Sequence, residues 1–132
     1  MNEEVVVILV EKARVLVVDD DPSIREMLSD FLAMEGYEVE TAADGSEGLR
    51  AVEESSPSVI VLDMRMPVLD GWGFARELRE RGIKLPILVV TAAQSPRRWA
   101  EEIGADGYLA KPFDLIDLLT AIERISPTPN GH

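Results

Sequence analysis

Residues 59–71, V-I-V-L-D-M-R-M-P-V-L-D-G, form the stretch that decides the fold of this chain. It opens with four apolar residues, a pattern typical of a strand that is buried on both faces of a sheet. Asp63 follows directly, and Pro67 and the Asp70-Gly71 pair then turn the chain. Because burial of an unpaired carboxylate is costly, we expect Asp63 at the carboxyl end of a central strand, where open α/β sheets form their ligand crevice. Taken alone, the pattern also fits an aspartate that only caps a loop.

The composition indicates one domain of a soluble protein. The chain has 132 residues, of which 46% are hydrophobic and 29% charged, and this is enough for one hydrophobic core. A net charge of −12 argues against direct nucleic-acid binding, which needs clustered basic side chains. The chain has no cysteine, and its one histidine is His132, which argues against thiolate chemistry and against a histidine-based zinc site. No apolar run is long enough to cross a bilayer and no basic secretory signal is present, so we expect a cytoplasmic protein without a membrane partner.

Apolar runs and amphipathic segments alternate five times along the chain. The expected strands are residues 15–18, 37–41, 59–62, 86–90 and 107–110. The expected helices are residues 22–35, 46–54, 72–81, 96–103 and 115–125. In the first helix Asp21 is a natural N-cap, and the expected buried face consists of Ile24, Met27, Leu28, Phe31 and Leu32. Short links between alternating strands and helices predict an α/β fold, a parallel sheet with helices on both faces.

Polar side chains follow four of the expected strands. Asp19 and Asp20 follow the first strand, Asp63 the third, Thr91 the fourth and Lys111 the fifth. Because parallel strands end at the same edge of a sheet, these groups are expected to converge. Each residue alone also fits an ordinary role, an N-cap, a strand-end threonine or a surface lysine. Their joint occurrence at successive strand ends favours a functional site.

The clustered carboxylates predict a bound cation and a phosphoryl-transfer reaction. Two carboxylates about 4 Å apart repel each other by roughly 4 kcal/mol at an effective dielectric constant near 20, so the cluster should bind a cation or have raised pKa values. Oxygen ligands suit Mg²⁺. A carboxylate beside this ion can attack phosphorus and form an aspartyl phosphate. Lys111 would then supply a positive charge, and Thr91 a hydroxyl donor, to the phosphoryl oxygens.

The motifs V-V-D-D, L-D-M-R-M-P-V-L-D-G, V-V-T-A and A-K-P-F occur in this order at suitable spacing. With these motifs, residues 15–125 resemble the receiver domains of two-component response regulators, of the chemotaxis-regulator type. The resemblance implies a flavodoxin-like, doubly wound sheet with the strand order 2-1-3-4-5 and a site at its switch point. It divides the chain into an apolar extension (1–12), a receiver domain (13–126) and a flexible tail (127–132).

The resemblance also implies a role for each residue of the site. Asp63 would be the phosphoacceptor, and Thr91 and Lys111 would contact the phosphoryl group. The implied Mg²⁺ ligands are the carboxylates of Asp20 and Asp63, the backbone carbonyl of Arg65 and a water held by Asp19. The bond between Lys111 and Pro112 would be a cis peptide.

A switch follows from the same resemblance. Thr91 would move toward the phosphoryl group, and Tyr108 would turn into the space that Thr91 leaves. Arg65 and Ala93 would tune the lifetime of the phosphoryl group. Both tryptophans are expected to be helix-packing residues, and the candidate interface consists of Arg97, Arg98, Trp99 and Tyr108.

The expected function is a phosphorylation-controlled switch with no output domain in the chain. It would accept a phosphoryl group on Asp63 from a histidine kinase or a histidine phosphotransfer protein, and pass the signal by contact to a protein target that the sequence does not name. It would catalyse only its own phosphorylation and dephosphorylation, and would not be a turnover enzyme. The alternatives are a phosphate-independent docking module, one domain of a longer regulator, and an aspartyl-phosphate hydrolase, which usually has a second aspartate where this chain has Arg65.

The extension contains six apolar residues, V-V-V-I-L-V at positions 5–10, that read as a strand. In the strand order 2-1-3-4-5 the first strand already has two neighbours, so a hairpin from residues 5–10 onto it would displace one of them. Exposed, this segment would promote association. We therefore expect it to pair at a sheet edge or with a second molecule, so that a homodimer would form through it or through the output face. A monomer by light scattering, with unprotected amides over residues 5–10, would contradict this expectation.

Overall fold

Parallel strands form the centre of the molecule. The computed structural model describes residues 13–92 and 94–127. The strands are β1 (Arg14–Val18), β2 (Glu38–Ala42), β3 (Val59–Leu62), β4 (Ile87–Thr91) and β5 (Gly107–Ala110). The helices are α1 (Pro22–Met34), α2 (Gly45–Ser55), α3 (Gly71–Glu80), α4 (Pro96–Ile103) and α5 (Leu115–Ile125). Strands and helices alternate along the chain, as the sequence pattern predicted.

The five strands form one sheet in the order β2-β1-β3-β4-β5, and every neighbouring pair is parallel. This confirms the expected order and places β1 and β3 side by side in the middle of the sheet. The register pairs Val18 with Leu62 at the ends of these two strands. As a result, the residues that follow β1 and β3 emerge beside each other.

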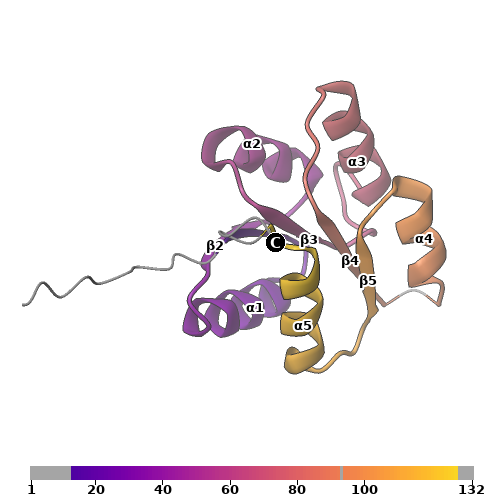
Figure 1. Ribbon diagram of the computed structural model, residues 1–132. Coiled ribbons are helices and arrows are strands. Elements are labelled where there is room, and N and C mark those ends of the chain that lie inside the picture. The colour runs from indigo at the N-terminus through magenta and orange to yellow at the C-terminus, as the bar shows by residue number, and fades with distance from the viewer. Residues whose placement is uncertain (1–12, 93, 128–132) are drawn as a thin grey trace, which may run out of the picture.

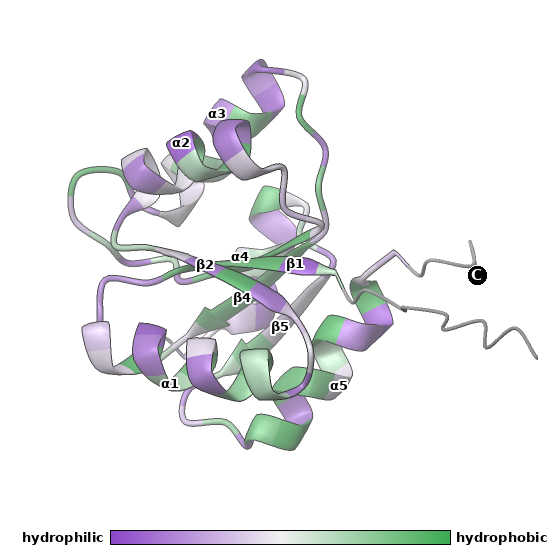
Figure 2. Ribbon diagram, turned by 90° about the vertical axis from the view of Figure 1, so that its left-hand side faces the viewer, coloured by the Kyte–Doolittle hydropathy of each residue, from purple (hydrophilic) through white to green (hydrophobic). Residues whose placement is uncertain are grey.

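Helices cover the sheet on both faces (Figure 1). Leu49, Phe74 and Ile103 anchor α2, α3 and α4 in a hydrophobic cluster on one face. Leu28, Leu32 and Leu118 anchor α1 and α5 in a cluster on the other face. Figure 2 shows the apolar strands between the two helix layers. The side chains of β1 and β3 that enter these clusters are almost completely buried, as the runs of apolar residues predicted.

Local sequence signals place the helix ends to within one or two residues. The carboxylates of Asp21, Asp44 and Asp70 each accept a backbone N–H in the first turn of α1, α2 and α3. Ser95 precedes α4 as expected, but its side chain makes no such hydrogen bond. The expected burial of Met27 is wrong, because its side chain is 40% exposed at the margin of the buried face of α1.

Several expectations fall on residues that the structure does not describe. These are the strand at residues 5–10, the role of Ala93 in the phosphoryl lifetime, and the tail beyond residue 127. Among the described helices, none is long and apolar enough to cross a membrane.

Val68 adopts a backbone conformation that a β-branched residue rarely takes. Its φ angle is 69°, in the left-handed region, and its side chain is 83% exposed. This conformation costs an L-residue about 1–2 kcal/mol, and no packing offsets the cost. Replacement by glycine removes the strain but raises the backbone entropy of the unfolded chain, so Val68→Gly should increase the free energy of unfolding by about 1 kcal/mol. Urea unfolding checks this, and Val68→Ala, which keeps the Cβ atom, should gain much less.

Candidate functional site

The side chains of the site come from the carboxyl ends of four neighbouring strands. Asp19 and Asp20 follow β1, Asp63 follows β3, Thr91 ends β4 and Lys111 follows β5. Backbone hydrogen bonds continue the sheet past the strand ends: the N–H of Asp63 donates to the carbonyl of Val18 at 2.9 Å, and the N–H of Lys111 donates to that of Thr91 at 2.8 Å. The convergence predicted from the sequence is therefore present.

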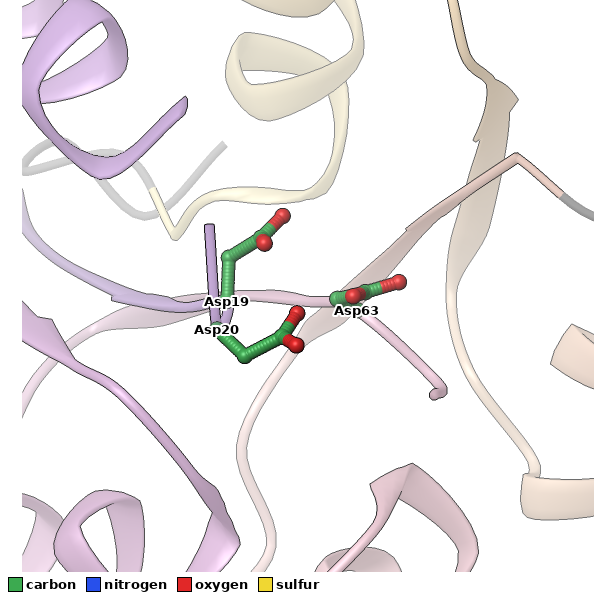
Figure 3. A group of neighbouring side chains, drawn as sticks. All are labelled: Asp19, Asp20 and Asp63. Atoms are coloured by element: carbon green, nitrogen blue, oxygen red, sulfur yellow. The ribbon is translucent and has the colours of Figure 1, made fainter. Parts of the chain in front are cut away.

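Three carboxylates form the acidic part of the site. Oxygen atoms of Asp19, Asp20 and Asp63 all lie within 4.8 Å of one another, and Figure 3 shows Asp19 and Asp20 extending beside Asp63. Asp19 and Asp63 are only 3% and 7% exposed, whereas Asp20 is open to solvent. The cluster therefore has two buried negative charges and one accessible carboxylate.

Lys111 is the cation of this cluster. Its Nζ atom donates to Oδ2 of Asp19 at 2.7 Å and lies 3.9 Å from Oδ2 of Asp63. The side chain of Lys111 is 17% exposed, so solvent screens these contacts only weakly. The bond between Lys111 and Pro112 is cis, which confirms the expectation from the family resemblance.

The backbone orients the carboxylate of Asp63. Its Oδ1 atom accepts the N–H of Met64 at 2.9 Å, and the carbonyl of Met64 accepts the N–H of Gly71 at 2.9 Å. A Cβ atom on Gly71 would lie 2.8 Å from the Cα atom of Met64 and 3.0 Å from the carbonyl oxygen of Asp63. The sequence marked Gly71 only as a turn residue, but its role here is to let the start of α3 approach the backbone beside Asp63.

Burial and charge raise the pKa of Asp63 to about 6. Removal of the carboxylate from water is the largest cause, and the nearby carboxylate of Asp19 is the second. Lys111 and the N–H of Met64 act in the opposite direction and lower the pKa. The net effect is a carboxyl group whose ionised form is less favoured in the folded protein than in water, even with Lys111 beside it.

The carboxylates fit a hard divalent cation. All three side chains offer oxygen, which Mg²⁺ prefers over nitrogen or sulfur. The structure brings together the acidic side chains that the resemblance implied for the metal site. Burial is the main cause of the raised pKa of Asp63, and the repulsion by Asp19 that adds to it is what such an ion would relieve.

A cavity of about 550 Å³ opens beside Asp63. Its lining includes the predicted site residues Thr91 and Lys111, together with Ala92, Gln94 and Ser95 of the following loop. The remaining lining residues are Arg65, Arg98 and Trp99. The cavity is large enough for a phosphoryl group and part of the molecule that donates it.

Arg65 and Trp99 make a contact that the sequence did not reveal. The guanidinium carbon of Arg65 lies 5.2 Å from the centroid of the Trp99 ring, within the range of a cation–π interaction. Trp99 also packs edge-on against Trp72, with ring centroids 4.7 Å apart. The expectation that both tryptophans pack helices together is confirmed for α3 and α4.

The remaining candidate residues belong to the expected switch and interface. Tyr108 is on the edge strand β5 and is 46% exposed. Arg97 pairs with Glu101 on the surface of α4, and Arg98 pairs with Glu102. Tyr108 and Arg97 are not part of the cavity wall, so their expected roles in the switch and the interface stay predictions.

Known proteins share this sequence pattern. The sequence model of one family, the response regulator receiver domain, matches residues 15–123. Response regulator MprA of Mycobacterium leprae (strain TN) is 47% identical over 114 residues, which cover 85% of this chain and 50% of that protein. Response regulator MprA of Mycobacterium sp. (strain KMS) is 46% identical over 114 residues, with the same shares covered. The chain thus spans about half the length of the curated relatives that it matches.

Solved structures are similar in fold over most of the chain. The chemotaxis response regulator CheY4 of Vibrio cholerae has a TM-score of 0.79 and 42% sequence identity, and the match covers 86% of this chain and 98% of that one. The response regulator protein TrrA from Thermotoga maritima, solved in complex with Mg²⁺-BeF, has a TM-score of 0.78 and 34% identity, covering 86% of this chain and 99% of that one.

Proposed function

The chain belongs to the response regulator receiver domain family, and from this premise we propose that Asp63 accepts a phosphoryl group from a histidine kinase or a histidine phosphotransfer protein. One observation supports the proposal above all others. Asp63 lies at the wall of a cavity, with two further carboxylates on one side and Lys111 within 3.9 Å. A carboxylate in this setting has both an entry route for a donor and the charges needed to receive it.

The transfer would form one bond and break one. A carboxylate oxygen of Asp63 attacks phosphorus, and the bond between phosphorus and the donor atom breaks, so the donor leaves with that electron pair. The N–H of Met64 keeps the carboxylate oriented during the attack. Lys111 and Thr91 line the same cavity, where the ammonium group would balance the negative charge of the phosphoryl oxygens and the hydroxyl would donate a hydrogen bond to them.

Mg²⁺ is the cofactor that fits this site. Asp19, Asp20 and Asp63 would hold it, with the backbone carbonyl of Arg65 as a further ligand. When bound, the ion neutralises the acceptor carboxylate and the phosphoryl oxygens that approach it. Lys111 forms an ion pair with Asp19 at 2.7 Å. Asp20 is exposed, so its carboxylate remains accessible to the ion.

The phosphoryl group would act as a signal to a partner. It adds negative charge and acceptor oxygens at Asp63, which would draw the Thr91 hydroxyl toward it and allow Tyr108 to turn inward. Such a change selects between two conformations of the chain. The surface affected would comprise α4, β5 and α5, where Tyr108 and Arg97 are exposed. The chain would promote only its own phosphorylation and hydrolysis.

Intact-mass analysis after incubation with acetyl phosphate and Mg²⁺ tests the proposal. We expect a phosphoryl adduct that requires Mg²⁺ and that hydroxylamine removes, because hydroxylamine attacks acyl phosphates. The adduct should be absent from Asp63→Ala and retained in Asp21→Asn, since asparagine caps helix α1 as well as aspartate does.

An adduct on Asp63→Ala would exclude Asp63 as the acceptor. A chain that binds its partners equally well with and without Asp63, and that takes no phosphoryl group from acetyl phosphate or from a histidine kinase, would instead be a docking module.

A further inference from the structure

Arg65 and Trp99 connect two sides of the cavity beside Asp63. Arg65 belongs to the loop that follows β3, and Trp99 lies on α4. Both residues line the cavity, and the guanidinium of Arg65 rests over the indole ring. Their contact therefore closes part of the cavity rim, at the side where α4 faces the phosphoacceptor loop.

The Trp99 ring is itself held in place. Trp72 of α3 packs against it at 4.7 Å with the two ring planes 66° apart. The indole N–H of Trp72 donates to Oε2 of Glu102 at 2.9 Å, and Arg98 donates to Oε1 of the same carboxylate at 3.2 Å. These contacts fix Trp72 between α3 and α4, and Trp72 in turn limits the movement of Trp99.

Arg65 keeps its positive charge available to the cavity. Among the residues that the structure describes, no carboxylate forms an ion pair with it, although the chain carries a net charge of −12. An aromatic face attracts a guanidinium without neutralising it. The charge can therefore still act on an anion that enters beside Asp63.

We propose that Trp99 is a positioning residue, which holds the guanidinium of Arg65 over the phosphoryl group of Asp63 and so slows its hydrolysis. This inference rests on the proposed function of Asp63. In hydrolysis, a water oxygen attacks phosphorus and the bond from phosphorus to the Asp63 oxygen breaks, with its electron pair left on the carboxylate. The attacking water loses a proton to solvent, and inorganic phosphate is released. A side chain that covers the phosphoryl group from the cavity rim obstructs the approach of that water.

The half-life of the phosphoryl adduct measures this effect. The protein is loaded with acetyl phosphate and Mg²⁺, the donor is removed, and the loss of the adduct is followed by intact mass. We expect Trp99→Leu and Arg65→Met to shorten the half-life by about two- to fivefold each, the factor that corresponds to an exposed cation–π contact. The double variant should be no shorter-lived than Arg65→Met alone, because the ring acts through the arginine.

Two further variants separate positioning from a general structural role. Trp99→Phe keeps an aromatic face and should recover most of the wild-type half-life, whereas leucine, which is also apolar, should not. Arg50→Met is the matched control, since Arg50 is an exposed arginine on α2 that does not line the cavity. Its half-life should equal that of the wild type.

Each other result overturns the inference. Unchanged half-lives in both single variants would show that the contact does not affect hydrolysis. If the half-life in the double variant were shortened by the product of the two single factors, the two residues would act separately. A longer half-life in Trp99→Leu would show that the ring holds Arg65 away from the phosphoryl group. Failure of the wild type to form an adduct with any donor would refute the proposed function, and this inference with it, whereas an adduct insensitive to both variants refutes the inference alone.

Discussion

Asp63→Asn should increase the free energy of unfolding by about 3 kcal/mol at pH 7 in Mg²⁺-free buffer, since a pKa of about 6 lies roughly two units above the usual 3.8. The asparagine keeps an oxygen that can accept the N–H of Met64, and it removes the buried charge that Asp19 repels. Loss of this carboxylate should therefore stabilise the fold, which is opposite to the usual effect of changing a buried residue.

The increase in the free energy of unfolding caused by Asp63→Asn should depend on pH. Burial raises the pKa of Asp63 in the folded protein to about 6, so the folded state binds a proton more tightly than the unfolded state does. The ionised group then destabilises the fold fully above about pH 6, and not at all below about pH 4. The advantage of the asparagine variant should accordingly decrease between pH 6 and pH 4 and disappear at lower pH.

Urea unfolding of both proteins across this pH range checks the prediction. Asp114→Asn is a suitable control, because Asp114 is exposed and its side chain makes no capping hydrogen bond. A constant difference between Asp63→Asn and the wild type from pH 4 to pH 8 would refute the assignment. Mg²⁺ should reduce the difference at pH 7, since the ion would stabilise the wild-type carboxylate.

Lys111→Met should have an effect of similar size in the opposite direction. Removal of the ammonium group leaves the buried carboxylate of Asp19 without the partner that lies 2.7 Å away. Loss of one member of a buried ion pair costs about 3–5 kcal/mol, and we expect about 3 kcal/mol here because Asp63 can take up a proton. The pKa of Asp63 should rise further, since Lys111 is the main group that lowers it.

Mg²⁺ distinguishes this electrostatic effect from a packing defect. A divalent cation among the carboxylates should restore much of the stability of Lys111→Met, and its effect on the variant should exceed its effect on the wild type. Urea unfolding with and without Mg²⁺ at pH 7 measures both quantities. The matched control is Lys84→Met, which removes an exposed ammonium group outside the carboxylate cluster. It should change the free energy of unfolding by less than about 0.5 kcal/mol. Equal destabilisation with and without Mg²⁺ would contradict the prediction.

The fold class and the site could be predicted from the sequence because the sequence pattern shows where each strand ends. Runs such as residues 59–62 are apolar on both faces, which identifies central strands, and the first polar residue after each run marks the carboxyl edge. In a parallel sheet all these edges coincide, so Asp63 and Lys111 could be placed together without knowledge of the register. The order of the strands needed the family resemblance, because periodicity does not reveal which strands are neighbours.

Other features depend on tertiary geometry that a sequence pattern does not contain. Met27 fits the helical spacing of a buried residue, yet it is 40% exposed in the folded chain. The left-handed backbone of Val68 contradicts its local preference, and no propensity argument would place a valine there. The contact of Arg65 with Trp99 joins a loop and a helix that are distant in sequence, so the cavity rim became visible only in the folded chain.

The two tryptophans of the chain, Trp72 and Trp99, lie in contact with each other, and Trp99 lines the cavity beside Asp63. All intrinsic tryptophan fluorescence of this protein therefore originates from one place. Its intensity should respond to ionisation of Asp63, to a metal ion among the carboxylates and to the position of Arg65, while changes elsewhere in the molecule should leave it almost unaffected. The protein thus carries a built-in optical probe of its own site, which can follow each step in real time without a label.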